Sequence, residues 1–154
     1  MSDLHCPARL YVARPGEARG DGSGAVPDDA GLSDRGREQV RDLAGRLGSK
    51  RIATVYAGGE VRRGAQSAAL AGDVLDVPVR TLEDLHPTRL REALEQVADQ
   101  HRGESVLVFS TREAMAPALP GLDGELPRCE TVLVEVDADG WRILGGREAG
   151  NPAP

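Results

Sequence analysis

Apolar and polar residues along the chain follow two alternating spacings, one typical of strands and the other of helices. Short runs of consecutive apolar or β-branched residues predict strands at 8–14, 52–56, 77–81 and 105–109. Apolar positions three and four residues apart predict helices at 33–47, 60–71 and 88–101. Strands that alternate with helices in this way indicate a mainly parallel sheet with helices on both faces.

The pattern changes after residue 109. A short helix is predicted at 112–119, where Pro120 stops it. Strands at 131–136 and 141–144 are separated by Asp137-Ala138-Asp139-Gly140, a sequence typical of a hairpin turn. The predicted fold is therefore a three-layer α/β/α sandwich with a mainly parallel sheet and an antiparallel C-terminal hairpin.

Turn-forming residues indicate where the first long helix and its preceding loop lie. Residues 15–30 are rich in Gly, Pro, Asp and Ser, which favours a loop. Ser33 is placed to begin the next helix, and Gly48 is placed to terminate it. A chain of 154 residues fits one domain, so we expect a single domain over 1–154, with an ordered core at about 7–146 and a frayed C-terminal tail.

Composition narrows the classes of partner. Hydrophobic residues make up 40% of the chain and charged residues 29%, as in ordinary globular proteins, whereas aromatic residues make up only 3%. The net charge of −6 and the scarcity of aromatic residues argue against nucleic-acid binding. The 18 arginines against one lysine favour a bacterial source of high GC content.

The sequence contains no membrane span, signal peptide or paired cysteine motif. No apolar run is long enough to span a membrane, and the N-terminus does not resemble a signal peptide, so we expect a cytoplasmic protein. Cys6 and Cys129 form no CxxC pair and are expected to be reduced thiols. We expect neither a metal nor a cofactor.

Candidate chemistry is sought where the strands end, because open α/β sheets bind ligands beyond the carboxyl ends of their strands. Three segments follow the first, second and fourth predicted strands in this way. They are 14–17, 58–66 and 110–112.

At these positions the chain resembles the histidine phosphatase superfamily, also called phosphoglycerate-mutase-like, and its length is similar to that of small phosphohistidine phosphatases. LYVARPGEA resembles the family's first strand with its Arg-His-Gly-Glu signature, and LSDRGREQVRDLAGRL resembles the following helix. VYAGGEVRRGAQSA resembles the segment that holds Arg-Ala-x-Gln-Thr-Ala in the family. GESVLVFST and TVLVEVDADGWRIL resemble the strand that ends in Ser-His-Gly and the closing hairpin.

The resemblance implies that two catalytic histidines are replaced. In the family one histidine attacks phosphorus, and a second helps to stabilise the developing charge. Pro15 occupies the first position and has no lone pair to offer, while Thr111 occupies the second and is not a cation near neutral pH. The family's general acid position falls at Pro87, so Glu83, Asp84 or His86 are the possible substitutes.

The residues that remain suit an anion site. The expected ligand-binding residues are Arg14, Arg63, Ser110, Thr111 and Arg112. The alternatives are structural: the arginines pair with Glu17, Glu60 or Glu83, and Ser110 or Thr111 caps a helix. His86 is then a loop residue, and His5 and His101 lie outside the site.

Three functions are compatible with this pattern. The first is a pseudophosphatase that binds a phosphorylated or carboxylated small molecule or a phosphoprotein, in a binding or regulatory role. The second is a reassigned enzyme of bacterial specialised metabolism, such as an isomerase, cyclase or dehydratase. The third is a weak phosphatase that uses water or His86. The sequence does not specify the oligomeric state.

Overall fold

The computed structural model describes residues 8–17, 31–57, 62–81, 90–110, 131–137 and 140–145. In chain order the elements are β1 (Ala8–Ala13), α1 (Asp34–Arg46), the 3₁₀ turn η2 (Gly48–Lys50), β2 (Ile52–Ala57), α2 (Arg62–Leu75), β3 (Val79–Thr81), α3 (Leu90–Gln100), β4 (Ser105–Phe109), β5 (Thr131–Asp137) and β6 (Gly140–Gly145).

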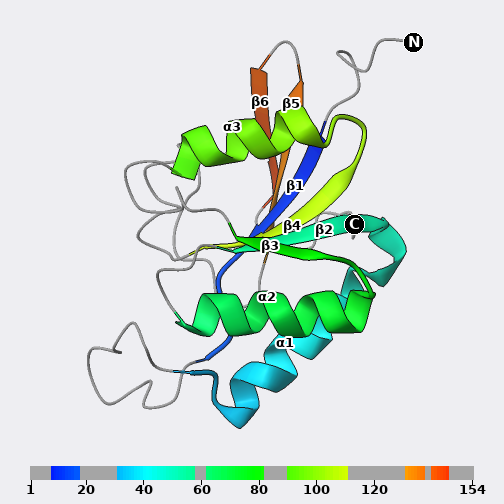
Figure 1. The fold of residues 1–154 in the computed structure, drawn as a ribbon. Coiled ribbons are helices and arrows are strands. Elements are labelled where there is room, and N and C mark those ends of the chain that lie inside the picture. Colours follow the sequence, from blue (N-terminus) through cyan, green and yellow to red (C-terminus); the bar gives the residue numbers. More distant parts are fainter. Residues whose placement is uncertain are drawn as a thin grey trace.

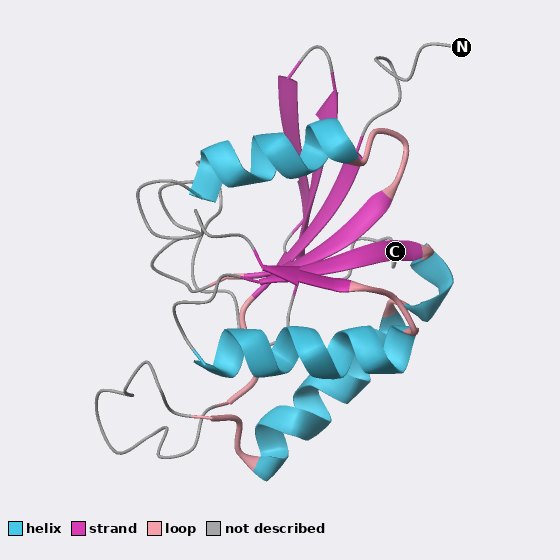
Figure 2. Ribbon diagram, viewed as in Figure 1, coloured by secondary structure: helices cyan, strands magenta, loops and turns pink. Residues whose placement is uncertain are grey.

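The six strands form one sheet in the order β3-β2-β4-β1-β5-β6. Neighbouring strands from β3 to β1 run parallel, whereas β5 runs antiparallel to both β1 and β6 (Figure 2). The predicted parallel sheet with an antiparallel C-terminal hairpin is confirmed.

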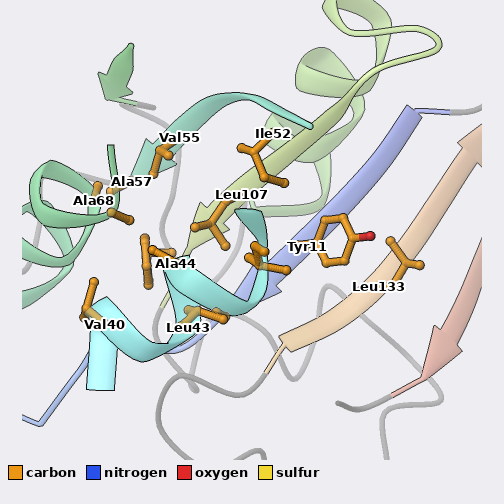
Figure 3. Close-up of a cluster of buried hydrophobic side chains, with 14 of the residues drawn as sticks. Tyr11, Val40, Leu43, Ala44, Ile52, Val55, Ala57, Ala68, Leu107 and Leu133 are labelled. Atoms are coloured by element: carbon orange, nitrogen blue, oxygen red, sulfur yellow. The ribbon is translucent and has the colours of Figure 1, made fainter. Parts of the chain in front are cut away.

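Helices cover both faces of this sheet. Figure 1 shows α1 and α2 on one face and α3 on the other. The strands β1, β2 and β4 alternate in the expected way: Tyr11, Val55 and Leu107 pack toward α1 and α2 (Figure 3). Side chains one position along, including Val12 and Val108, pack toward α3. Burial of both faces explains why these strands read as continuous apolar runs.

The second helix extends further toward its C-terminus than predicted. The helix predicted at 60–71 spans Arg62–Leu75 and continues through Gly72. A Cβ at Gly72 would overlap Cγ2 of Val79, so this glycine allows α2 to pack closely on β3. The helix ends at Leu75, because the next residue, Asp76, has a φ of 56° and lies outside the helical region.

The first long helix begins and ends as predicted, with Leu47 as its C-cap, but Gly48 does not terminate it in the expected way. The Oγ of Ser33 accepts a hydrogen bond from the Gly36 amide, which caps α1. Gly48 does not take up the left-handed conformation; the chain passes through η2, and Arg51 has the positive φ of 56°. The short helix predicted at 112–119 and the tail after 145 lie outside the described residues.

Candidate functional site

Three predicted site residues lie at the carboxyl edge of the parallel strands. Arg14 directly follows β1, Ser110 directly follows β4, and Arg63 is the second residue of α2, the helix after β2. The amide of Ser110 donates a hydrogen bond of 2.9 Å to the carbonyl of Ala13, which joins the ends of β1 and β4. This edge is where open α/β sheets place their ligands.

The segment after β1 is tightly held. Pro15 and Gly16 are both buried, and the Gly16 amide lies 3.1 Å from Oγ of Ser67, to which it donates a hydrogen bond. A Cβ at position 16 would lie 2.5 Å from the carbonyl oxygen of Gly36. Only glycine therefore allows the chain to pass this closely to the start of α1.

Glu17 stabilises the start of α1. Its amide donates to Oε1 of Gln39 at 2.9 Å, and its carbonyl accepts from the amide of Ser33 at 2.9 Å. The hydroxyl of Ser33 lies 3.0 Å from the carboxylate of Glu17. The Glu17 side chain thus acts in the packing of the loop against the helix.

Arg63 has a buried guanidinium nitrogen without a hydrogen-bond partner among the described residues. Its side chain is half-buried, and Nη1 is fully enclosed without a hydrogen-bond partner among the residues that the structure describes. A buried charged donor is costly unless an acceptor reaches it. Arg14 is half-buried as well and already takes part in an interaction.

The backbone around Arg63 also favours negative charge. Arg63 lies in the first turn of α2, where free N–H groups and the helix dipole attract anions. No acidic residue occupies that first turn. An anionic ligand that accepts a hydrogen bond from Nη1 would therefore also be attracted by the positive end of the α2 dipole.

Gln66 is a structural residue. Its Oε1 accepts a hydrogen bond of 2.7 Å from the amide of Leu32, and Gly31 packs against the same side-chain amide. This contact ties the segment before α1 to α2.

The remaining site predictions lie outside the described residues. They concern Thr111 and Arg112 after β4, Glu83 and His86 after β3, and the alternative partner Glu60. Their roles stay predictions, as do those of Arg14, Arg63 and Ser110.

Sequence reasoning missed Ser67 and Gln39, whose side chains hold the loop. Both residues stand in segments that resemble the family's motifs, and Ser67 also lies four residues after Arg63, on the same face of α2. Nothing in the sequence indicates that its partner is the amide of Gly16, 51 residues away.

His101 lies in the turn at the amino end of β4, opposite the candidate site, as expected. It is nevertheless buried and bonded at both nitrogens. Nε2 lies 2.6 Å from the hydroxyl of Tyr56, and Nδ1 lies 2.7 Å from Oε1 of Glu104.

The described segments contain neither a metal-binding cluster nor a membrane-spanning helix. No group of three or more His, Cys, Asp or Glu side chains in these segments is arranged to hold a metal ion. None of the described helices is long and apolar enough to cross a membrane.

Solved structures share this fold. YhfR of Bacillus stearothermophilus is 16% identical with a TM-score of 0.81, over 92% of this chain and 96% of that chain. The protein histidine phosphatase SixA, solved with tungstate, is 19% identical with a TM-score of 0.73, over 93% and 98% of the two chains. Phosphoglycerate mutase of Bacillus anthracis is 11% identical with a TM-score of 0.81, over 92% and 93%.

Sequence comparison gives the family. No curated protein matches the chain. The family model described as the histidine phosphatase superfamily (branch 1) matches residues 10–88, just over half of the chain. The protein therefore belongs to the histidine phosphatase superfamily.

Proposed function

We propose that this protein is a catalytically degenerate histidine phosphatase that binds an anionic ligand without hydrolysing it, in a binding or regulatory role. Its ligand is a phosphorylated or carboxylated small molecule or a phosphoprotein. Two properties of the candidate site support the proposal. Pro15 offers no nucleophile, and Nη1 of Arg63 is buried without a hydrogen-bond partner among the described residues.

Pro15 supports the absence of phosphoryl transfer. It stands between Arg14 and Gly16, where the family's signature has the histidine that attacks phosphorus. The proline nitrogen is part of the peptide bond, so it neither attacks phosphorus nor donates a hydrogen bond. Pro15 is buried, and the hydrogen bond from the Gly16 amide to Ser67 holds the adjoining backbone.

The unpartnered Nη1 of Arg63 is the observation that carries the binding proposal. A guanidinium nitrogen enclosed by protein gains most when an oxyanion accepts its hydrogen bonds. Guanidinium groups suit both phosphate and carboxylate. SixA, which shares this fold, was solved with tungstate. Tungstate is therefore a suitable probe for this chain.

The test is calorimetric titration of the purified protein with inorganic phosphate and with tungstate. We expect binding by the wild type and a loss of at least about tenfold in affinity for Arg63→Ala, which removes a charge-assisted interaction. Arg62→Ala is the matched control, because Arg62 is the exposed neighbour on the same turn. Equal weakening by both variants, or no binding by the wild type, would contradict the proposal.

A further inference from the structure

Ser67 connects two parts of the candidate site that are far apart in sequence. Arg63 and Ser67 lie one turn apart on the same face of α2. The Ser67 side chain is fully buried, and its Oγ accepts the hydrogen bond from the Gly16 amide at 3.1 Å. One helix thus carries Arg63 and also holds the loop that contains Arg14 and Pro15.

The loop has a second attachment, to α1. The amide of Glu17 donates to Gln39, and the Glu17 carbonyl accepts from Ser33. Gly16 also passes close to the start of α1, where an added Cβ would lie 2.5 Å from the carbonyl oxygen of Gly36. The contact with Ser67 therefore sets the position of the loop relative to α2.

We propose that Ser67 is a positioning residue that fixes the loop carrying Arg14 against Arg63 and thereby sets the affinity of the anion site. This inference rests on the proposed function. Binding is tighter when the groups that contact a ligand are already held in place, because no ordering cost is paid on binding. A residue that touches no ligand then controls affinity through the geometry of residues that do.

Variants at position 67 separate the hydroxyl from the rest of the side chain. Ser67→Ala removes the acceptor and leaves the buried Gly16 amide unpaired, whereas Ser67→Thr keeps an acceptor oxygen. Thr54→Val is the matched control, because it removes another buried hydroxyl, in the amino-terminal half of β2. The full-length chain is used throughout.

Three quantities are measured for each protein: the tungstate dissociation constant by calorimetry, the hydrogen-exchange rate of the Gly16 amide by NMR, and the thermal midpoint. We expect Ser67→Ala to weaken tungstate binding about tenfold and to accelerate Gly16 exchange by a similar factor. Ser67→Thr should stay within about twofold of wild type in affinity, and so should Thr54→Val, even where its thermal midpoint falls.

Each other outcome has a distinct meaning. If the wild type binds tungstate and Ser67→Ala binds it equally well, the positioning role is wrong while the proposed function stands. An equal loss in Thr54→Val or Ser67→Thr would attribute the effect to general destabilisation or to altered packing, and would also overturn the inference. If the wild type does not bind tungstate, both the proposed function and the inference fail.

Discussion

The hydroxyl of Tyr56 lies 2.6 Å from Nε2 of His101, and the two rings meet edge to face at 80°. Both side chains are buried, and Nδ1 of His101 lies 2.7 Å from the carboxylate of Glu104. His101 follows the last turn of α3, and its backbone amide still bonds to the carbonyl of Val97. This hydrogen-bonded chain therefore joins the end of α3 to β2.

Removing the Tyr56 hydroxyl should destabilise the fold. Tyr56→Phe leaves Nε2 of a buried histidine without its partner, so we expect the free energy of unfolding to fall by about 1–3 kcal/mol. Urea denaturation at pH 7 measures the change. Tyr11→Phe is the matched control, because it removes the hydroxyl of the other buried tyrosine, which lies outside this hydrogen-bonded chain. Equal stability of the two variants would contradict the assigned role.

Two glycines of α1 should respond in opposite directions to the same substitution. A Cβ at Gly36 would overlap the carbonyl oxygen of Glu17, so Gly36→Ala should destabilise the protein by about 1–3 kcal/mol. Gly45 is exposed with open space around it, so Gly45→Ala should stabilise the helix by about 0.5–1 kcal/mol. Thermal unfolding of both variants checks this, and a change of the same sign in both would refute the close packing of Gly36 on the loop.

Tyr11 should make stability depend on alkaline pH. Burial raises the pKa of Tyr11 above its ordinary value of 10.0; the guanidinium of Arg9 opposes this rise and the carboxylate of Glu135 adds to it. The unfolded chain therefore loses this proton first as pH increases. The stabilising contribution is complete below pH 10 and is lost as pH rises through the folded-state pKa.

The measurement compares urea unfolding at pH 8 and pH 11 for the wild type and Tyr11→Phe. We expect the wild type to lose more stability between these two values than the variant, because the variant lacks the titrating hydroxyl. The difference in tyrosinate absorbance between the wild type and Tyr11→Phe, followed against pH, gives the pKa of Tyr11. An identical pH dependence in both proteins would show that Tyr11 is not held in its neutral form.

Local features of the fold were predictable from the sequence, and long-range contacts were not. Ser33 was identified as the start of α1 because a capping residue acts on amides within the next few positions. The strands were identified because their burial on both faces leaves continuous apolar runs. The continuation of α2 past residue 71 was not predictable, because the close packing of Gly72 depends on Val79 in β3.

The candidate site shows the same division. The positions of Arg14, Arg63 and Ser110 follow from the rule that loops after parallel strands share one edge. The contacts that hold this edge together join Gly16 to Ser67 and Leu32 to Gln66, across 51 and 34 residues. Spacing within one element carries no signal for such pairs.

The most direct test of the proposed function is the hydrolysis of an aryl phosphate and of a phosphohistidine peptide by the purified protein, with Arg63→Ala purified in parallel. Pro15 offers no nucleophile, so we predict that the wild type releases phosphate no faster than the variant, and that both rates reflect background. A wild-type rate clearly above that of Arg63→Ala would contradict the account and would show that another residue carries the reaction.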